Sequence, residues 1–222
     1  MKYFTESFTS FFNELAINNQ KEWFHANKKR YESEVKKPFE FFLSVLIAAI
    51  QKEDPSLSIS PKDCILRINR DLRFSKDKTP YNLHYSAVVS NGGRKDKSVP
   101  GLFLRFMPDE VGIMGGAYVL DKDQLFNLRS DIKKNPTTLK VLIQEESFKA
   151  KFGTIQGEES KRMPVEFQEA SEKNPLLLKK QFYFVSRRES TMITSDHLLD
   201  ELMDYWRAAR PLNEYLTSII HN

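Results

Sequence analysis

Apolar positions at the start of the chain recur at helical spacing. In the first segment they follow the i, i+3, i+4, i+7 pattern of a buried helix face: Phe8, Phe11, Phe12 and Leu15. A second helix is expected from Gln20. Pro38 predicts the start of a third, because its missing N–H has no partner in a first helical turn. The region 1–53 is therefore predicted to be helical.

The hydrophobic period changes after the break between Pro55 and Pro61. From there to residue 120 the chain is mainly strand-like, and the predicted strands are 64–68, 84–89, 101–107 and 111–119. Short turns join the later strands, so neighbouring strands are expected to be antiparallel. Gly115-Gly116 favours a β-bulge over the alternative, a place where a ligand or another backbone comes close.

Residues 121–222 mix helix and strand. The expected features are an N-cap at Asp121, a helix from Pro136, an irregular connection over 153–175, a strand over 181–186, a helix capped by Ser195 or Asp196, and a final short helix from Pro211. This order of elements predicts an α+β fold, with helices packed on an antiparallel sheet. A single domain over 1–222 is expected.

Composition and cysteine usage indicate the cellular setting. Hydrophobic and charged fractions of 40% and 29% are typical of a soluble globular protein. No apolar run reaches the roughly 20 residues that span a bilayer, and Met1–Ser10 lacks the features of a secretory signal. The single cysteine, Cys64, favours a reducing compartment. We therefore expect a cytoplasmic protein without a membrane partner.

The positive charge of the chain is concentrated in one segment. Residues 62–97 contain nine Lys/Arg and four Asp/Glu, a net charge of +5, whereas residues 1–61 are neutral and residues 98–222 carry −1. Such a local field favours an anionic ligand or partner. A solvated loop is the alternative interpretation.

The centre of this segment is the run from Arg67 to Tyr81, which contains five cations and two carboxylates. Guanidinium groups match phosphate and carboxylate oxygens, so the predicted ligand-binding residues are Arg67, Arg70, Arg73, Ser75, Lys78 and Tyr81. The best enzymatic interpretation is acid–base or phosphoryl chemistry by Asp71, Asp77 and His84. The alternative is a structural Arg–Asp network that fixes the sheet to the helices.

Other chemistry has weaker support in the sequence. Scattered histidines and one cysteine give no metal-ligand spacing, so neither a metal nor a cofactor is predicted. Cys64 with His84 is a conceivable nucleophile pair, but a buried, inert thiol is favoured, because Cys64 lies in an apolar stretch.

Two binding functions compete with a small-molecule pocket. A nucleic-acid groove would use the basic run 94–97 with Tyr81, Tyr85 and Phe103 for base stacking. A protein-interaction surface is the other alternative. Whether the protein is an enzyme, and its oligomeric state, do not follow from the sequence.

The chain resembles a widespread bacterial and fungal family of conserved hypothetical proteins that bear a domain of unknown function. The similarity extends from about Phe8 to Leu216, and it rests on the run RINRDLRFSKDKTPYNLH together with Asn18-Asn19, Glu22-Trp23-Phe24, Tyr31, Pro38-Phe39, Pro100-Gly101, Gly115-Gly116-Ala117-Tyr118, Arg129 and Arg162-x-Pro164. Asn82 departs from the pattern of the family, in which we expect a lysine at this position in many members. The resemblance implies a single domain with a shared site near the run, and no particular activity.

Overall fold

The computed structural model describes residues 1–221 of the chain, and its fold class is α+β. The antiparallel sheet has the order β1-β2-β3-β4. Its strands are β1 (Tyr85–Val89), β2 (Leu102–Phe106), β3 (Glu110–Ala117) and β4 (Phe182–Glu189). The predicted fold class is confirmed, and the sequence pattern locates all four of these strands.

Helices precede the sheet and also separate and follow its strands. The α-helices are α1 (Glu6–Ile17), α2 (Lys21–Ala26), α3 (Lys28–Arg30), α4 (Lys37–Glu53), α5 (Pro61–Cys64), α6 (Lys122–Lys134), α7 (Thr138–Gln144), α8 (Glu146–Phe152), α9 (Gln168–Lys173) and α10 (Leu198–Ile220). A π-helix, η1 (Tyr31–Lys36), lies between α3 and α4. Three short 3-10 helices complete the set: η2 (Val165–Phe167), η3 (Pro175–Leu178) and η4 (Ser190–Thr194).

The described chain forms two compact units. Unit 1 consists of Met1–Arg94, Phe103–Ile113 and Arg187–Met203. Unit 2 consists of Lys95–Leu102, Met114–Ser186 and Asp204 onwards. Strands β2, β3 and β4 and helix α10 each contribute residues to both units. The single domain expected from the sequence stays a prediction.

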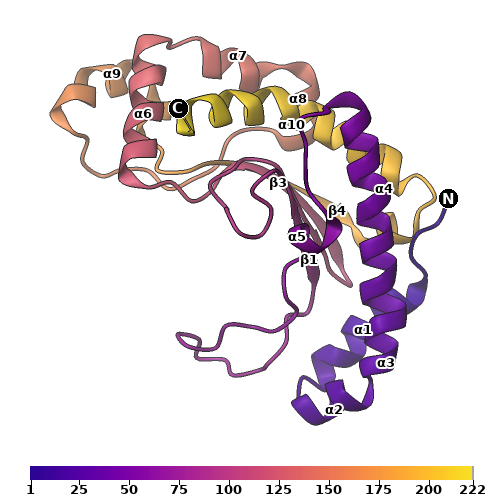
Figure 1. The fold of residues 1–222 in the computed structure, drawn as a ribbon. Helices are drawn as coiled ribbons and strands as arrows, with labels where there is room; N and C mark the ends of the chain where they lie inside the picture. Colours follow the sequence, from indigo (N-terminus) through magenta and orange to yellow (C-terminus); the bar gives the residue numbers. More distant parts are fainter. Residues whose placement is uncertain (222) are drawn as a thin grey trace. The chain divides into compact units, whose positions relative to one another are not determined.

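The core of unit 1 is a cluster of phenylalanine rings between its helices and its strands. Phe106 on β2 is fully buried, and its ring centroid lies 5.4 Å from that of Phe39 on α4 and 6.2 Å from that of Phe8 on α1. Figure 1 shows α4 as a long helix with α1, α2 and α3 grouped near its start. The apolar faces predicted for residues 1–53 therefore form this core.

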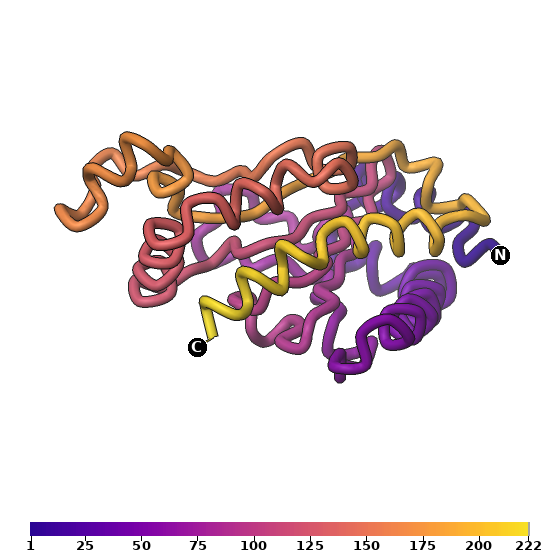
Figure 2. The backbone as a smooth tube through the Cα atoms, turned by 90° about the horizontal axis from the view of Figure 1, so that it is seen from above, coloured from indigo at the N-terminus to yellow at the C-terminus, as the bar shows by residue number. Residues whose placement is uncertain are grey.

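Unit 2 has a smaller aromatic core. The ring of Phe184 on β4 lies 5.0 Å from Phe148 and 4.6 Å from Phe152, both on α8. In Figure 2 the later part of α10 (yellow) passes the helices α6–α8, and Tyr215 on α10 donates a 2.6 Å hydrogen bond to Asp131 on α6. Asp121 caps α6, as the sequence predicts.

Pro38 lies in the first turn of α4, as the sequence predicts, whereas Pro211 does not start a separate helix. The structure places η1 directly before α4, so the helical run continues through Pro38. A proline ring clashes with the carbonyl group four residues earlier, and the wider turn of a π-helix relieves this clash. Pro211 lies inside α10, where buried leucines on both sides of it, Leu202 and Leu212 among them, hold the helix against the core.

The strand predicted for residues 64–68 is wrong. Pro61 starts the short helix α5, which ends at Cys64, because the fixed φ of proline suits the first helical position. Beyond it, Ile65 forms an isolated antiparallel bridge with Ala87 on β1. This segment therefore extends the sheet edge by a single bridge rather than by a full strand.

Gly116 lies within an uninterrupted β3. Its φ is 85°, and a Cβ atom on it would lie 2.2 Å from the Phe182 carbonyl oxygen of β4. The close approach of a neighbouring backbone explains the glycine at this position, and the favoured bulge stays a prediction.

Candidate functional site

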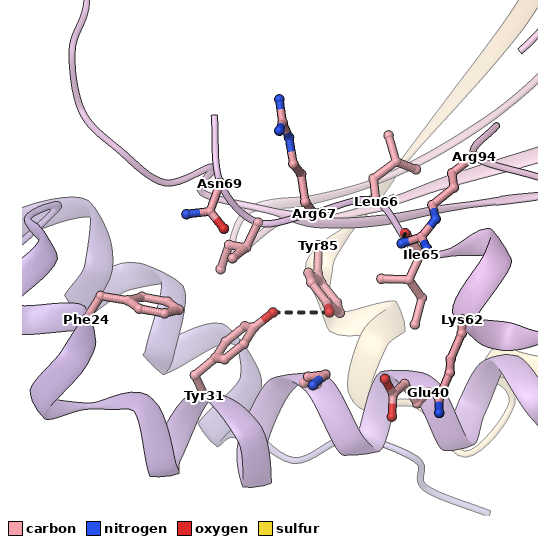
Figure 3. A pocket seen from close by; sticks show the side chains of 12 residues that line it. Phe24, Tyr31, Glu40, Lys62, Ile65, Leu66, Arg67, Asn69, Tyr85 and Arg94 are labelled. Carbon is pink, nitrogen blue, oxygen red and sulfur yellow. Dashed lines mark hydrogen bonds between the residues drawn. The ribbon is translucent and has the colours of Figure 1, made fainter. Parts of the chain in front are cut away.

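A pocket of about 440 Å³ opens in unit 1 between its helices and the segment that precedes β1. Its lining residues come from α2, η1, α4, α5, the stretch 65–69, β1 and the turn after β1: Phe24, Tyr31, Lys36, Glu40, Lys62, Ile65, Leu66, Arg67, Ile68, Asn69, Tyr85 and Arg94. Figure 3 shows these side chains between the helices and the strand segments above them. A concave site of this volume suits a small molecule.

Two tyrosine hydroxyl groups meet in the wall of the pocket. The Tyr31 hydroxyl donates a 3.1 Å hydrogen bond to the Tyr85 hydroxyl, and both side chains are buried. Burial raises the pKa of each phenol above its ordinary value, so both hydroxyls keep their protons at neutral pH. Because one proton serves the bond between them, the hydroxyl proton of Tyr85 remains for a further acceptor.

The π-helix η1 positions the helical side of the pocket. Tyr31 begins it and Lys36 ends it, and both line the pocket. Lys36 forms a 3.2 Å ion pair with Glu32, one turn earlier. π-helical turns are often found at functional sites, because they change which side chains face inward.

Lys62 and Arg94 contribute cations from two separate segments. The backbone N–H of Arg94 donates to the Asp63 carbonyl oxygen at 2.9 Å, which fixes its turn beside α5. Gly93 makes this approach possible, because its φ is 51° and a Cβ there would lie 2.6 Å from the same oxygen. Arg94 also donates from Nη1 to the Ile65 carbonyl oxygen at 3.4 Å. Arg94 is thus anchored at the pocket, which Lys62 also lines.

The cation-rich run folds into a hairpin that extends away from the sheet (Figure 1). Asn69 and Tyr81 form an antiparallel bridge at its base. The Asn19 side chain donates to the Tyr81 carbonyl oxygen at 2.9 Å and accepts from its N–H at 3.1 Å. The Tyr81 ring stacks on Phe24 with centroids 4.0 Å apart. The base of the hairpin is therefore tied to the helices of unit 1.

Arg70 holds the hairpin together from within. Its guanidinium donates to the Asp77 carboxylate and to the Thr79 hydroxyl, and at 3.2 Å to the Ser75 hydroxyl and to the Thr79 carbonyl oxygen. Hydrogen bonds from Thr79 and from Arg70 lower the pKa of Asp77 to about 2. The partners of Arg70 all lie within its own hairpin.

Arg67 and Arg73 both lie near Asp71. Arg73 donates to this carboxylate at 2.7 Å and lowers its pKa to about 2. Arg67 lies 3.9 Å from Asp71, and its side chain is 69% exposed. Among the three arginines predicted to bind the ligand, Arg67 lines the described pocket, whereas Arg70 and Arg73 do not.

The three predicted catalytic residues do not come together. Asp71 and Asp77 pair with arginines in the hairpin. His84 is half-buried, and burial and then Arg105 on β2 lower its pKa to about 4. No hydrogen bond or ion pair within residues 1–221 links His84 to either aspartate. Their catalytic roles stay predictions.

The remaining predicted residues divide by burial. Ser75 and Lys78 bond within the hairpin, Ser75 to the Asp77 carbonyl oxygen and Lys78 to that of Leu72. Tyr81 and Tyr85 are buried, which removes them as stacking platforms for bases. Cys64 is also buried, and burial raises the pKa of its thiol to about 12, as expected of an inert cysteine.

Sequence reasoning missed several pocket residues. Lys62 and Arg94 lie within the +5 segment, and that charge excess was the signal for them. Tyr31 and Glu40 were not among the predicted site residues, because only the folded arrangement shows which helix positions border the pocket.

Truncation of Arg70 tests whether its hydrogen bonds stabilise the hairpin. We expect Arg70→Ala to accelerate amide hydrogen exchange over residues 71–79, because its four acceptors lie there. The control Arg73→Ala removes a side chain that is 77% exposed, and should leave the exchange nearly unchanged. Equal exchange in wild type and Arg70→Ala would contradict this role.

The ion pair between Arg70 and Asp77 has a defined pH dependence. The folded-state pKa of Asp77, about 2, lies below its ordinary value of 3.8. The stabilisation that the Asp77 carboxylate gives the hairpin is therefore complete when the pH is above this ordinary pKa, and it is lost as the pH falls toward about 2. In the wild type, the hairpin amides should stay protected from hydrogen exchange at a pH near 3.8, the ordinary pKa of Asp77. This protection should be lost as the pH falls toward about 2, the pKa of Asp77 in the folded protein.

Residues 1–221 lack two kinds of structural feature. None of their helices is long and apolar enough to cross a bilayer. No group of three or more histidine, cysteine, aspartate and glutamate side chains in this range is arranged to hold a metal ion.

Fold and site together define an α+β protein with an aromatic, cation-lined pocket beside a basic hairpin. The chain belongs to the family of conserved hypothetical proteins DUF2461, whose family model matches residues 7–215. This confirms the resemblance seen in the sequence. No curated protein matches the chain.

Proposed function

We propose that the protein binds a small anionic ligand, most simply one that bears a phosphate group, in the pocket of unit 1. The observation that carries the proposal is that three cationic residues, Lys62, Arg67 and Arg94, line one pocket. All three belong to the +5 segment. The proposal includes a cytoplasmic location, which is the expectation from the single cysteine.

The geometry near Lys62 supports a phosphate site. Lys62 is exposed, and no ion pair occupies its ammonium group within residues 1–221. Arg94 is held nearby through the hydrogen bond of its N–H to Asp63. A guanidinium fork and an ammonium group together match the oxygens of a phosphate.

No reaction is part of this proposal. With pKa values of about 2, Asp71 and Asp77 are weak bases at neutral pH, and neither lines the pocket. The catalytic assignment of these aspartates and of His84 remains a separate prediction.

Calorimetric titration with inorganic phosphate, a nucleotide panel and an oligonucleotide tests the proposal. We expect saturable binding of the small phosphates to the wild-type protein. Lys62→Ala should weaken it about tenfold or more, because a hydrogen bond to a charged group contributes about 1.5–3 kcal/mol.

Lys76→Ala is the matched control. It removes the same charge from the same segment, but Lys76 does not line the pocket, so phosphate affinity should change little. If both variants weaken binding equally, or if the wild-type protein binds no small phosphate, the pocket is not the site.

The hairpin favours a second candidate function, binding of single-stranded nucleic acid. Phe74 is 95% exposed, and the Arg73 guanidinium lies 5.9 Å from its ring centroid. An exposed ring beside cations suits a stacked base and its phosphates. Salt-dependent binding of the oligonucleotide alone, lost in Phe74→Ala, would support this candidate over the pocket.

A further inference from the structure

Glu40 is an acidic side chain in an otherwise cationic pocket. It lies on α4, is half-buried, and has no hydrogen bond or ion pair within residues 1–221. It lies close enough to Tyr31 and Tyr85 that its charge acts on both phenols. In Figure 3, Glu40 and Lys62 lie at the end of the pocket opposite Phe24.

An unpaired carboxylate is unfavourable for a site that binds only a bare anion. Like charges repel, and the repulsion is stronger in a partly buried pocket than in water. The carboxylate becomes favourable when the ligand brings hydrogen-bond donors to it, because a charged acceptor strengthens those bonds. Glu40 therefore restricts which anions the pocket accepts.

Hydroxyl groups fit this position better than an ammonium group. Lys36 and Lys62 line the same pocket and would repel a second cation. A hydroxyl can donate to the Glu40 carboxylate and also accept from the free Tyr85 hydroxyl proton or from a lysine. The pocket volume of about 440 Å³ is in the range of small-molecule sites.

We propose that the pocket binds a phosphorylated polyol of the sugar phosphate class, and that Glu40 is the residue that selects it by accepting hydrogen bonds from the ligand's hydroxyl groups. This inference rests on the proposed function, since Lys62 and Arg94 hold the phosphate. It adds the chemistry of the rest of the ligand.

Glu40→Gln tests this selection because it should shift two probes in opposite directions. Calorimetry would use inorganic phosphate and ribose 5-phosphate. We expect the wild type to bind ribose 5-phosphate about tenfold more tightly than phosphate. Glu40→Gln should weaken ribose 5-phosphate binding at least about threefold, because a neutral acceptor bonds more weakly, and should strengthen phosphate binding.

Glu172→Gln controls for net charge. Glu172 is exposed and does not line the pocket, so both affinities should stay unchanged. O-phosphoethanolamine serves as the ammonium-bearing probe, and it should bind less tightly than ribose 5-phosphate.

Four results would overturn the inference. Equal changes of both affinities in Glu40→Gln would show that Glu40 acts through charge alone. Tighter binding of O-phosphoethanolamine than of ribose 5-phosphate would assign Glu40 to an ammonium group. If phosphate binds the wild-type protein without any preference for the sugar phosphate, this inference fails while the proposed function holds. If no probe binds, both fail.

Discussion

Replacement of Gly116 by alanine should lower the free energy of unfolding by about 3 kcal/mol or more. A side chain in the left-handed region costs about 1–2 kcal/mol, and Gly116 has a φ of 85°. Its new Cβ would also lie 2.2 Å from the Phe182 carbonyl oxygen, so β3 and β4 would have to separate there. Urea unfolding monitored by circular dichroism measures this loss of unfolding free energy.

Gly153→Ala is the matched control for backbone strain alone. Gly153 has a φ of 72°, but nothing lies within 4 Å of a Cβ built on it. Its substitution should cost only about 1–2 kcal/mol, the strain of the left-handed conformation. Equal losses in the two variants would contradict the close strand approach at Gly116.

Replacement of Phe106 by alanine should cost about 3–5 kcal/mol, the usual range for a buried phenylalanine. Phe106 is fully buried on β2, and its ring lies 5.6 Å from that of Phe4 and 5.4 Å from that of Phe39. The cavity would open where α1 and α4 meet the strand. Chemical denaturation reports the change.

Phe74→Ala is the control for loss of an aromatic ring. This side chain is 95% exposed, so its removal should change stability by no more than about 0.5 kcal/mol. A large loss in Phe74→Ala, or a loss below about 1 kcal/mol in Phe106→Ala, would contradict the assigned core.

Periodic patterns predicted the fold well because burial repeats along each element. Phe8, Phe11 and Phe12 lie on one face of α1, and all three are buried. Pro38 indicated a helix start correctly, since it lies in the first turn of α4. Pro211 misled because a local signal competed with tertiary packing, which carries α10 past it.

Charge located the region of the candidate site but not its geometry. The +5 segment contains Lys62, Arg67 and Arg94. Sequence could not show that Arg70 would turn into its own hairpin toward Asp77, because seven residues separate the partners along an irregular chain. Glu40 and Tyr31 come from helices distant in sequence, so only the folded arrangement places them beside these cations.

The most direct test of the anion pocket is a crystal of the protein soaked with arsenate, a phosphate analogue whose arsenic atom scatters anomalously. We expect an anomalous peak between the Lys62 ammonium and the Arg94 guanidinium, within hydrogen-bond reach of both. A peak found only beside Arg70, Arg73 and Lys78 of the hairpin, or no peak at saturating arsenate, would contradict it.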